Sequence, residues 1–124
     1  MAKVFRQGDV LLTAVPKLPL GAKELQRDEH NRIVLAYGEA TGHAHAIRES
    51  NVMAFQVETA EDAALAGLPK VDYILVGGST KATVQHEYVD GRKAEHDSIL
   101  LDPGVYQVAA QVEYTPSALM RVSD

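Results

Sequence analysis

The chain has 124 residues, a net charge of −5, 46% hydrophobic residues and 23% charged residues. This composition is typical of a globular protein, and the length fits one domain covering residues 1–124. No apolar run approaches the roughly 18 to 20 residues that a membrane span requires. The absence of cysteine excludes disulfides, thiolate nucleophiles and sulfur metal ligands.

The charge pattern argues against nucleic acid as a partner, because the 12 basic residues form no run. The N-terminus reaches Arg6 and Asp9 before any apolar run long enough for a secretory signal, so we expect a cytoplasmic protein. Two kinds of partner remain possible: further copies of the same chain in a homo-oligomer, and a small-molecule ligand.

The first half of the chain predicts several short strands. Residues 10–15 form an apolar run between turn residues, which is typical of a buried strand. Residues 18–32 are polar and predict loop and turn, with His30 exposed. Residues 32–37 predict the next strand, and after a glycine break another strand runs to about Ile47.

That last strand contains a His-X-His pair. Successive side chains on a strand point to opposite faces, so His43 and His45 share one face, roughly 6.5 to 7 Å apart. Ala44 and Ala46 occupy the other face and are small enough to be buried easily. Two imidazoles at this spacing could bind one ion, provided that further ligands come from elsewhere in the fold.

A strand and a short helix are expected next. The alternation in residues 51–58 predicts a strand with Met53, Phe55 and Val57 on its inner face. Residues 59–69 begin with a threonine cap and acidic residues, and end at glycine and proline, which predicts a helix of barely two turns.

The Asp-Gly pair at 90–91 lies between two extended runs and favours a two-residue type I′ hairpin turn. This register pairs His86 with Glu95 and places His96 on the opposite face. We therefore do not expect His86 and His96 to bind the same ion.

Two further strands are predicted at residues 71–76 and 105–114. In the second strand, Tyr106 and Val108 belong to the apolar face. The opposite face is polar and carries Gln107, Gln111 and Glu113. These polar side chains either face solvent on an antiparallel sheet or line the mouth of a barrel.

Many short strands and one short helix predict an all-β fold, a small antiparallel β-barrel or β-sandwich. The pattern Gly38, His43, His45, Glu49 resembles the first cupin motif, whose family binds a metal inside a small jelly-roll barrel. In the second cupin motif a histidine follows a Pro-X-Gly turn. Here Asp102-Pro103-Gly104 is followed at that place by Gln107.

The chain also resembles a small, uncharacterised family of bacterial and phage proteins. The resemblance rests on four segments: Gln7 to Leu12, Gly38 to His45, Glu95-His96 with the Pro103-Gly104 turn, and Gln111 to Tyr114. It implies kinship and brings no established activity.

Our first hypothesis is a divalent-metal site for zinc, iron, manganese or nickel, built by His43, His45 and His96. The candidates for the remaining ligand are Glu49, Gln107, Glu87, Gln111 and Glu113. If the ion keeps an open position, the protein is a metal-dependent enzyme, with Glu113 as general base. The alternative is a non-enzymatic binding or assembly module, oligomeric or phage-associated, in which the histidines are structural.

Overall fold

The computed structural model describes residues 3–37, 43–57, 70–88, 90–94, 97–110, 113–115 and 118–120. All regular structure in these residues is β-strand, which confirms the predicted fold class. The strands are β1 (Val4–Gln7), β2 (Val10–Val15), β3 (Lys23–Leu25), β4 (Ile33–Tyr37), β5 (His43–Ile47), β6 (Val52–Gln56), β7 (Tyr73–Val76), β8 (Ala82–Tyr88), β9 (Ile99–Leu101), β10 (Gly104–Ala110), β11 (Glu113–Thr115) and β12 (Ala118–Met120).

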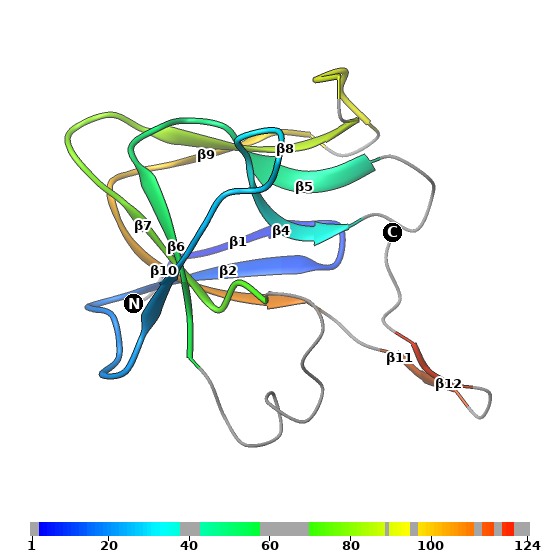
Figure 1. Cartoon of the computed structure of the whole chain (residues 1–124), viewed down its shortest axis with the longest axis horizontal. Helices are drawn as coiled ribbons and strands as arrows, with labels where there is room; N and C mark the ends of the chain where they lie inside the picture. Colours follow the sequence, from blue (N-terminus) through cyan, green and yellow to red (C-terminus); the bar gives the residue numbers. More distant parts are fainter. Residues whose placement is uncertain are drawn as a thin grey trace.

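The strands form two main antiparallel sheets. The six-stranded sheet has the order β1-β2-β10-β7-β6-β3, and the four-stranded sheet has the order β4-β5-β8-β9. β11 and β12 pair with each other, and Figure 1 shows this hairpin extending away from the two sheets. The described strands do not close into one barrel, so the fold is a small β-sandwich.

The hydrophobic core lies between the two sheets. Val10, Leu12 and Ile74 reach it from the six-stranded sheet, whereas Ile47 and Val84 reach it from the four-stranded sheet, and each of these five side chains is fully buried. The period-two patterns predicted for these segments therefore place one face of each sheet against the other.

Among the described residues there is no helix of the length and hydrophobicity that a membrane crossing requires. The predicted helix at 59–69 lies outside the described residues.

The inner face predicted for β6 is wrong. Val52 and Ala54 point into the core, opposite Val76 and Ile74 of β7, whereas Met53 is 38% exposed on the outer face. Phe55, on the same face as Met53, is nevertheless buried, with 9% exposure.

The predicted type I′ hairpin is also wrong. Glu87 pairs with Lys93 rather than with Ala94, and the backbone N–H of Tyr88 bonds to the carbonyl of Arg92. This register leaves three residues in the turn instead of two. Gly91 has a φ of 91°, the left-handed conformation that a three-residue hairpin loop needs at its last position. The predicted partners Glu95 and His96 lie outside the described residues.

Strand β4 contains a β-bulge. Val34 pairs with Ala46 and Ala36 pairs with His45, so Leu35 is the extra residue between the two pairs. Leu35 and Ala36 both point into the core, and Tyr37 consequently turns to the outer face, where it is 57% exposed.

Candidate functional site

The pairing of β5 with β8 gathers three histidines on the core face of the four-stranded sheet. His45 lies directly opposite His86, and His43 lies opposite Tyr88. The exposed fractions of His43, His45 and His86 are 8%, 0% and 1%. The prediction that His43 and His45 share a face is confirmed, and their partner across the strands is His86.

His43 and His86 share one proton. The distance between His43 Nδ1 and His86 Nε2 is 2.9 Å, and the two rings meet edge to face with their centroids 4.8 Å apart. One nitrogen must donate and the other must accept, so these two atoms hold a single proton between them. If both rings were protonated at these nitrogens, two donors would face each other.

Gln7 fixes the protonation of His45. The Gln7 Nε2 amide donates to the carbonyl oxygens of Val84 and Asp97, at 3.0 and 2.7 Å. Its Oε1 atom therefore faces His45 Nδ1, 2.8 Å away, and can only accept. His45 must carry its proton on Nδ1, which leaves Nε2 as the atom that can bind a metal when the ring is neutral.

The aromatic rings of His45, His86, His43 and Tyr88 form a continuous row of ring contacts, of which the His45–His86 contact is stacked. The rings of His45 and His86 are nearly parallel, 12° apart in orientation and 4.4 Å apart in centroid distance. At the other end, the ring of half-buried Tyr88 lies 5.3 Å from His43 and carries the exposed Arg92 guanidinium over its face. His43 is therefore the least buried of the three imidazoles and the one nearest to solvent.

The outer face of the same two strands carries a buried ion network. Glu87 is 1% exposed and accepts hydrogen bonds from the guanidinium of Arg48, with Nε 2.8 Å from Oε2. Arg32 reaches the same carboxylate from the β4 side, with Nη1 3.6 Å from Oε2. Ala44 and Ala46 lie between them on β5, and their small side chains leave room for the arginines to cross the strand.

Asp28 completes this network at its outer end. Its Oδ2 atom accepts a hydrogen bond from Arg32 Nε at 3.0 Å, and its Oδ1 atom accepts one from the Arg32 backbone N–H at 2.7 Å. Burial raises the pKa of Asp28, but these two hydrogen bonds outweigh it and hold the pKa below its ordinary value. The hydrogen bond to Glu87 raises the pKa of Arg48, so that guanidinium stays charged.

The structure does not bring the other predicted ligands to the histidines. Glu49 lies beyond the end of β5, half-buried, and its backbone carbonyl accepts a hydrogen bond from Arg27. Glu87 points to the opposite face of the sheet. Gln107 is exposed on the outer face of β10 in the other sheet. Within the described residues, no group of three or more His, Asp or Glu side chains is arranged to hold a metal ion.

Three predicted residues lie outside what the structure describes. His96 and Gln111 belong to segments that are not described, and Glu113 lies in β11 with its side chain outside the description. Asp97, which follows His96 in the sequence, is held by the same Gln7 amide that bonds to His45.

His86 is the residue that the sequence interpretation missed. The available signal was the alternation within β8, because Val84 and His86 have the same parity and Val84 is a natural core residue. A core-facing Val84 places His86 beside it on the core face, whatever the register of the hairpin that follows.

A family model described as "Domain of unknown function (DUF8820)" matches residues 6–111. The chain belongs to this family. The DUF8820 match includes Gln7 and all five histidines, and it ends before Glu113. No curated protein and no solved structure shows significant similarity to the chain.

Proposed function

We propose that the protein binds a divalent transition-metal ion on the core face of β5 and β8, with His43 and His86 as the first two ligands. The observation that carries this proposal is the 2.9 Å distance between His43 Nδ1 and His86 Nε2. Two imidazole nitrogens that bind one tetrahedral zinc ion at about 2.0–2.1 Å lie roughly 3.3 Å apart. A metal ion in place of the shared proton requires the two rings to separate by a few tenths of an ångström and to tilt, so that both nitrogens point at the ion.

His45 is prepared for the same role by Gln7. Histidines that bind metals usually donate their second ring N–H to an oxygen atom, which fixes the tautomer and the orientation of the ring. His45 has this arrangement, with Nδ1–H on Gln7 Oε1. Its ring is parallel to that of His86, so binding of both to one ion requires the two rings to tilt towards each other.

The ligand set selects the class of metal. Imidazole nitrogens suit zinc, copper, iron and nickel, whereas magnesium and calcium prefer oxygen ligands. His96 stays a predicted ligand, because its neighbour Asp97 is anchored beside His45 through Gln7 and the two-residue turn that separated it from His86 is not the observed one. A bound ion with an open coordination position would act as a Lewis acid. The role of Glu113 as general base stays a prediction.

Metal content measured by plasma mass spectrometry tests the proposal. The protein is purified untagged without chelator, and reconstituted with zinc, iron, manganese, copper or nickel. We expect near-stoichiometric metal in the wild type and a loss of at least tenfold in His43→Ala and His86→Ala. His30→Ala is the matched control, because His30 is an exposed turn residue with 41% side-chain exposure.

The conservative variants His43→Gln and His86→Gln separate loss of metal from loss of folding. They keep a polar side chain in the cluster and are checked by circular dichroism before the metal is measured. Metal that stays bound in folded His43→Gln and His86→Gln would overturn the site. An absence of metal after reconstitution would favour structural histidines in a non-enzymatic module.

A further inference from the structure

A separate cavity opens at the side of the sandwich, between edge strand β4 and strands β3 and β6. Its volume is about 290 Å³, at the lower end of the range for small-molecule sites. Apolar side chains line most of it: Leu25, Ile33, Val34, Ala54 and Val71. None of the three clustered histidines lines this cavity, so it is independent of the proposed metal site.

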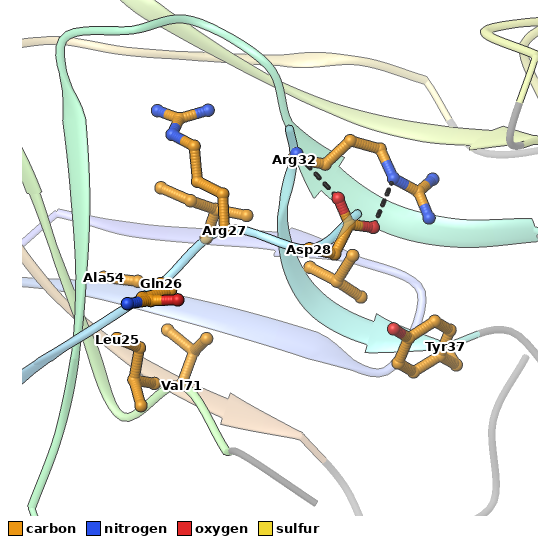
Figure 2. Close-up of a pocket in the computed structure, with 10 residues that line it drawn as sticks. Leu25, Gln26, Arg27, Asp28, Arg32, Tyr37, Ala54 and Val71 are labelled. Atoms are coloured by element: carbon orange, nitrogen blue, oxygen red, sulfur yellow. Dashed lines mark hydrogen bonds and ion pairs between the residues drawn. The ribbon is translucent and has the colours of Figure 1, made fainter. Parts of the chain in front are cut away.

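Tyr37 lines the cavity because of the bulge in β4. Without the extra residue Leu35, the alternation of the strand would turn Tyr37 into the core. The bulge instead pairs Tyr37 with Ala44 on the outer face. Figure 2 shows the Tyr37 ring on one side of the cavity and Leu25 and Val71 on the other. Bulges commonly re-aim one side chain at a functional site.

The charged side chains at the cavity are occupied by the protein itself. Arg27 donates through both terminal nitrogens to the backbone carbonyls of Asn31, Arg48, Glu49 and Val52. Asp28 is bonded to Arg32, as Figure 2 shows. These contacts hold the loop before β4 against the end of β5 and the start of β6, and they use the hydrogen-bonding groups of Arg27 and Asp28.

Two polar side chains at the cavity are not occupied in this way. The hydroxyl of Tyr37 and the amide of Gln26 make no hydrogen bond to another described residue, and both residues are exposed. A phenol and a carboxamide can each donate and accept hydrogen bonds without introducing a charge. They are the groups that remain to recognise a ligand above the apolar wall.

We propose that this cavity binds a small uncharged molecule with an apolar body and one amide or hydroxyl group. The body packs between Tyr37 and the side chains of Leu25 and Val71, and the polar group bonds to the Tyr37 hydroxyl. A charged ligand would have to be desolvated against an apolar wall where the Arg27 and Asp28 side chains are already engaged in hydrogen bonds within the protein, which is costly.

Three probes of the same shape and different charge test the proposal: benzamide, benzoate and benzylamine. Each is titrated into the ¹⁵N-labelled full chain, and the amide shifts are followed by NMR. We expect saturable shifts with benzamide that centre on residues 25–28, Tyr37 and Val71, and at least fivefold weaker binding of both charged probes. Equal or tighter binding of benzoate or benzylamine would overturn the ligand class.

Two variants test the site itself. Tyr37→Phe removes only the hydroxyl and should weaken benzamide roughly three- to tenfold, as expected for one lost hydrogen bond. Tyr73→Phe is the matched control, since Tyr73 is a half-buried tyrosine of β7 that does not line the cavity. Leu25→Trp fills the cavity from a partly exposed position and should abolish the shifts.

Unchanged benzamide binding in both Tyr37→Phe and Leu25→Trp would place the probe elsewhere and overturn the site. His43→Gln should bind benzamide as the wild type does. That result keeps the test of this cavity separate from the test of the metal site.

Discussion

The two faces of the β5–β8 pair bury polar groups in opposite ways. On the outer face, Glu87 lies between Arg32 and Arg48, so a buried charge is matched by opposite charges. On the core face, His43 and His86 lie together as two imidazole rings joined by one hydrogen bond. The outer face thus pairs buried opposite charges, whereas the core face pairs two rings of the same kind, where we propose that a cation binds.

This difference follows from alternate residues of the same two strands. Ala44 and Ala46 leave space on the outer face for long arginine side chains, and the histidines between them in the sequence fill the core face with flat rings. A buried ion pair loses its stabilising effect when one member is removed, because the other charge is left uncompensated. The imidazole pair is joined by a hydrogen bond rather than by opposite charges, so we expect substitutions on the two faces to differ in their effect on stability.

The largest effect is expected from Glu87→Ala. The substitution leaves the guanidinium of Arg32, which is 2% exposed, without its ion pair to β8, and we expect a loss of about 3–5 kcal/mol in the free energy of unfolding. Urea denaturation measures it. Asp90→Ala is the control, since Asp90 pairs with Arg92 at the exposed surface, and its free energy of unfolding should stay close to that of the wild type. A loss of unfolding free energy in Glu87→Ala as small as that in Asp90→Ala would show that the outer ion network does not stabilise the fold.

A smaller effect is expected from Gln7→Leu. The buried carbonyls of Val84 and Asp97 lose a donor and His45 loses its acceptor, which should cost about 2–3 kcal/mol. The same variant should lower metal content if Gln7 orients His45 as a ligand.

Gln107→Leu is the matched control for Gln7→Leu. Gln107 is exposed on the outer face of β10, so its replacement should change stability by about 0.5 kcal/mol or less. Metal content that falls in Gln107→Leu and not in Gln7→Leu would restore Gln107 as a ligand and remove the role assigned to Gln7.

The smallest effect concerns Asp28 at the end of the outer network. Its folded-state pKa lies below the ordinary value of 3.8, so the ionised carboxylate stabilises the fold above that pH. This contribution is lost as the pH falls through the lowered folded-state pKa. Asp28→Asn should be less stable than the wild type at pH 7, and the difference should shrink between pH 4 and pH 2. Urea midpoints at pH 7, 4 and 2 that fall in parallel for the two proteins would contradict this assignment.

Periodicity predicted the parts of the fold in which one strand face is strongly apolar. The limits of β2 were predicted as they are observed, and the apolar face of β10 with Tyr106 and Val108 is buried as expected. Ala44 and Ala46 are buried as expected too. In these strands the hydrophobic pattern alone determines which face meets the core.

The errors arose where tertiary packing or turn geometry overrides the local pattern. β6 has apolar residues on both faces, so its own sequence could not show that Met53 faces outward. In the hairpin, one additional turn residue changed the register, and an Asp-Gly pair is compatible with either length. The pairing of His86 with His45 depends on which strand lies beside β5, and no local signal reports that neighbour.

The place of β10 in the six-stranded sheet has a consequence for biosynthesis. β10 lies between β2 and β7, although residues 10–15 leave the ribosome long before residues 104–110. Until β10 is made, the sheet exists only as two separate parts, β1-β2 and β7-β6-β3, each with an open edge. Synthesis proceeds at roughly 5–20 residues per second. The nascent chain therefore exposes these edges for several seconds, and the six-stranded sheet is completed only after β10 has been made.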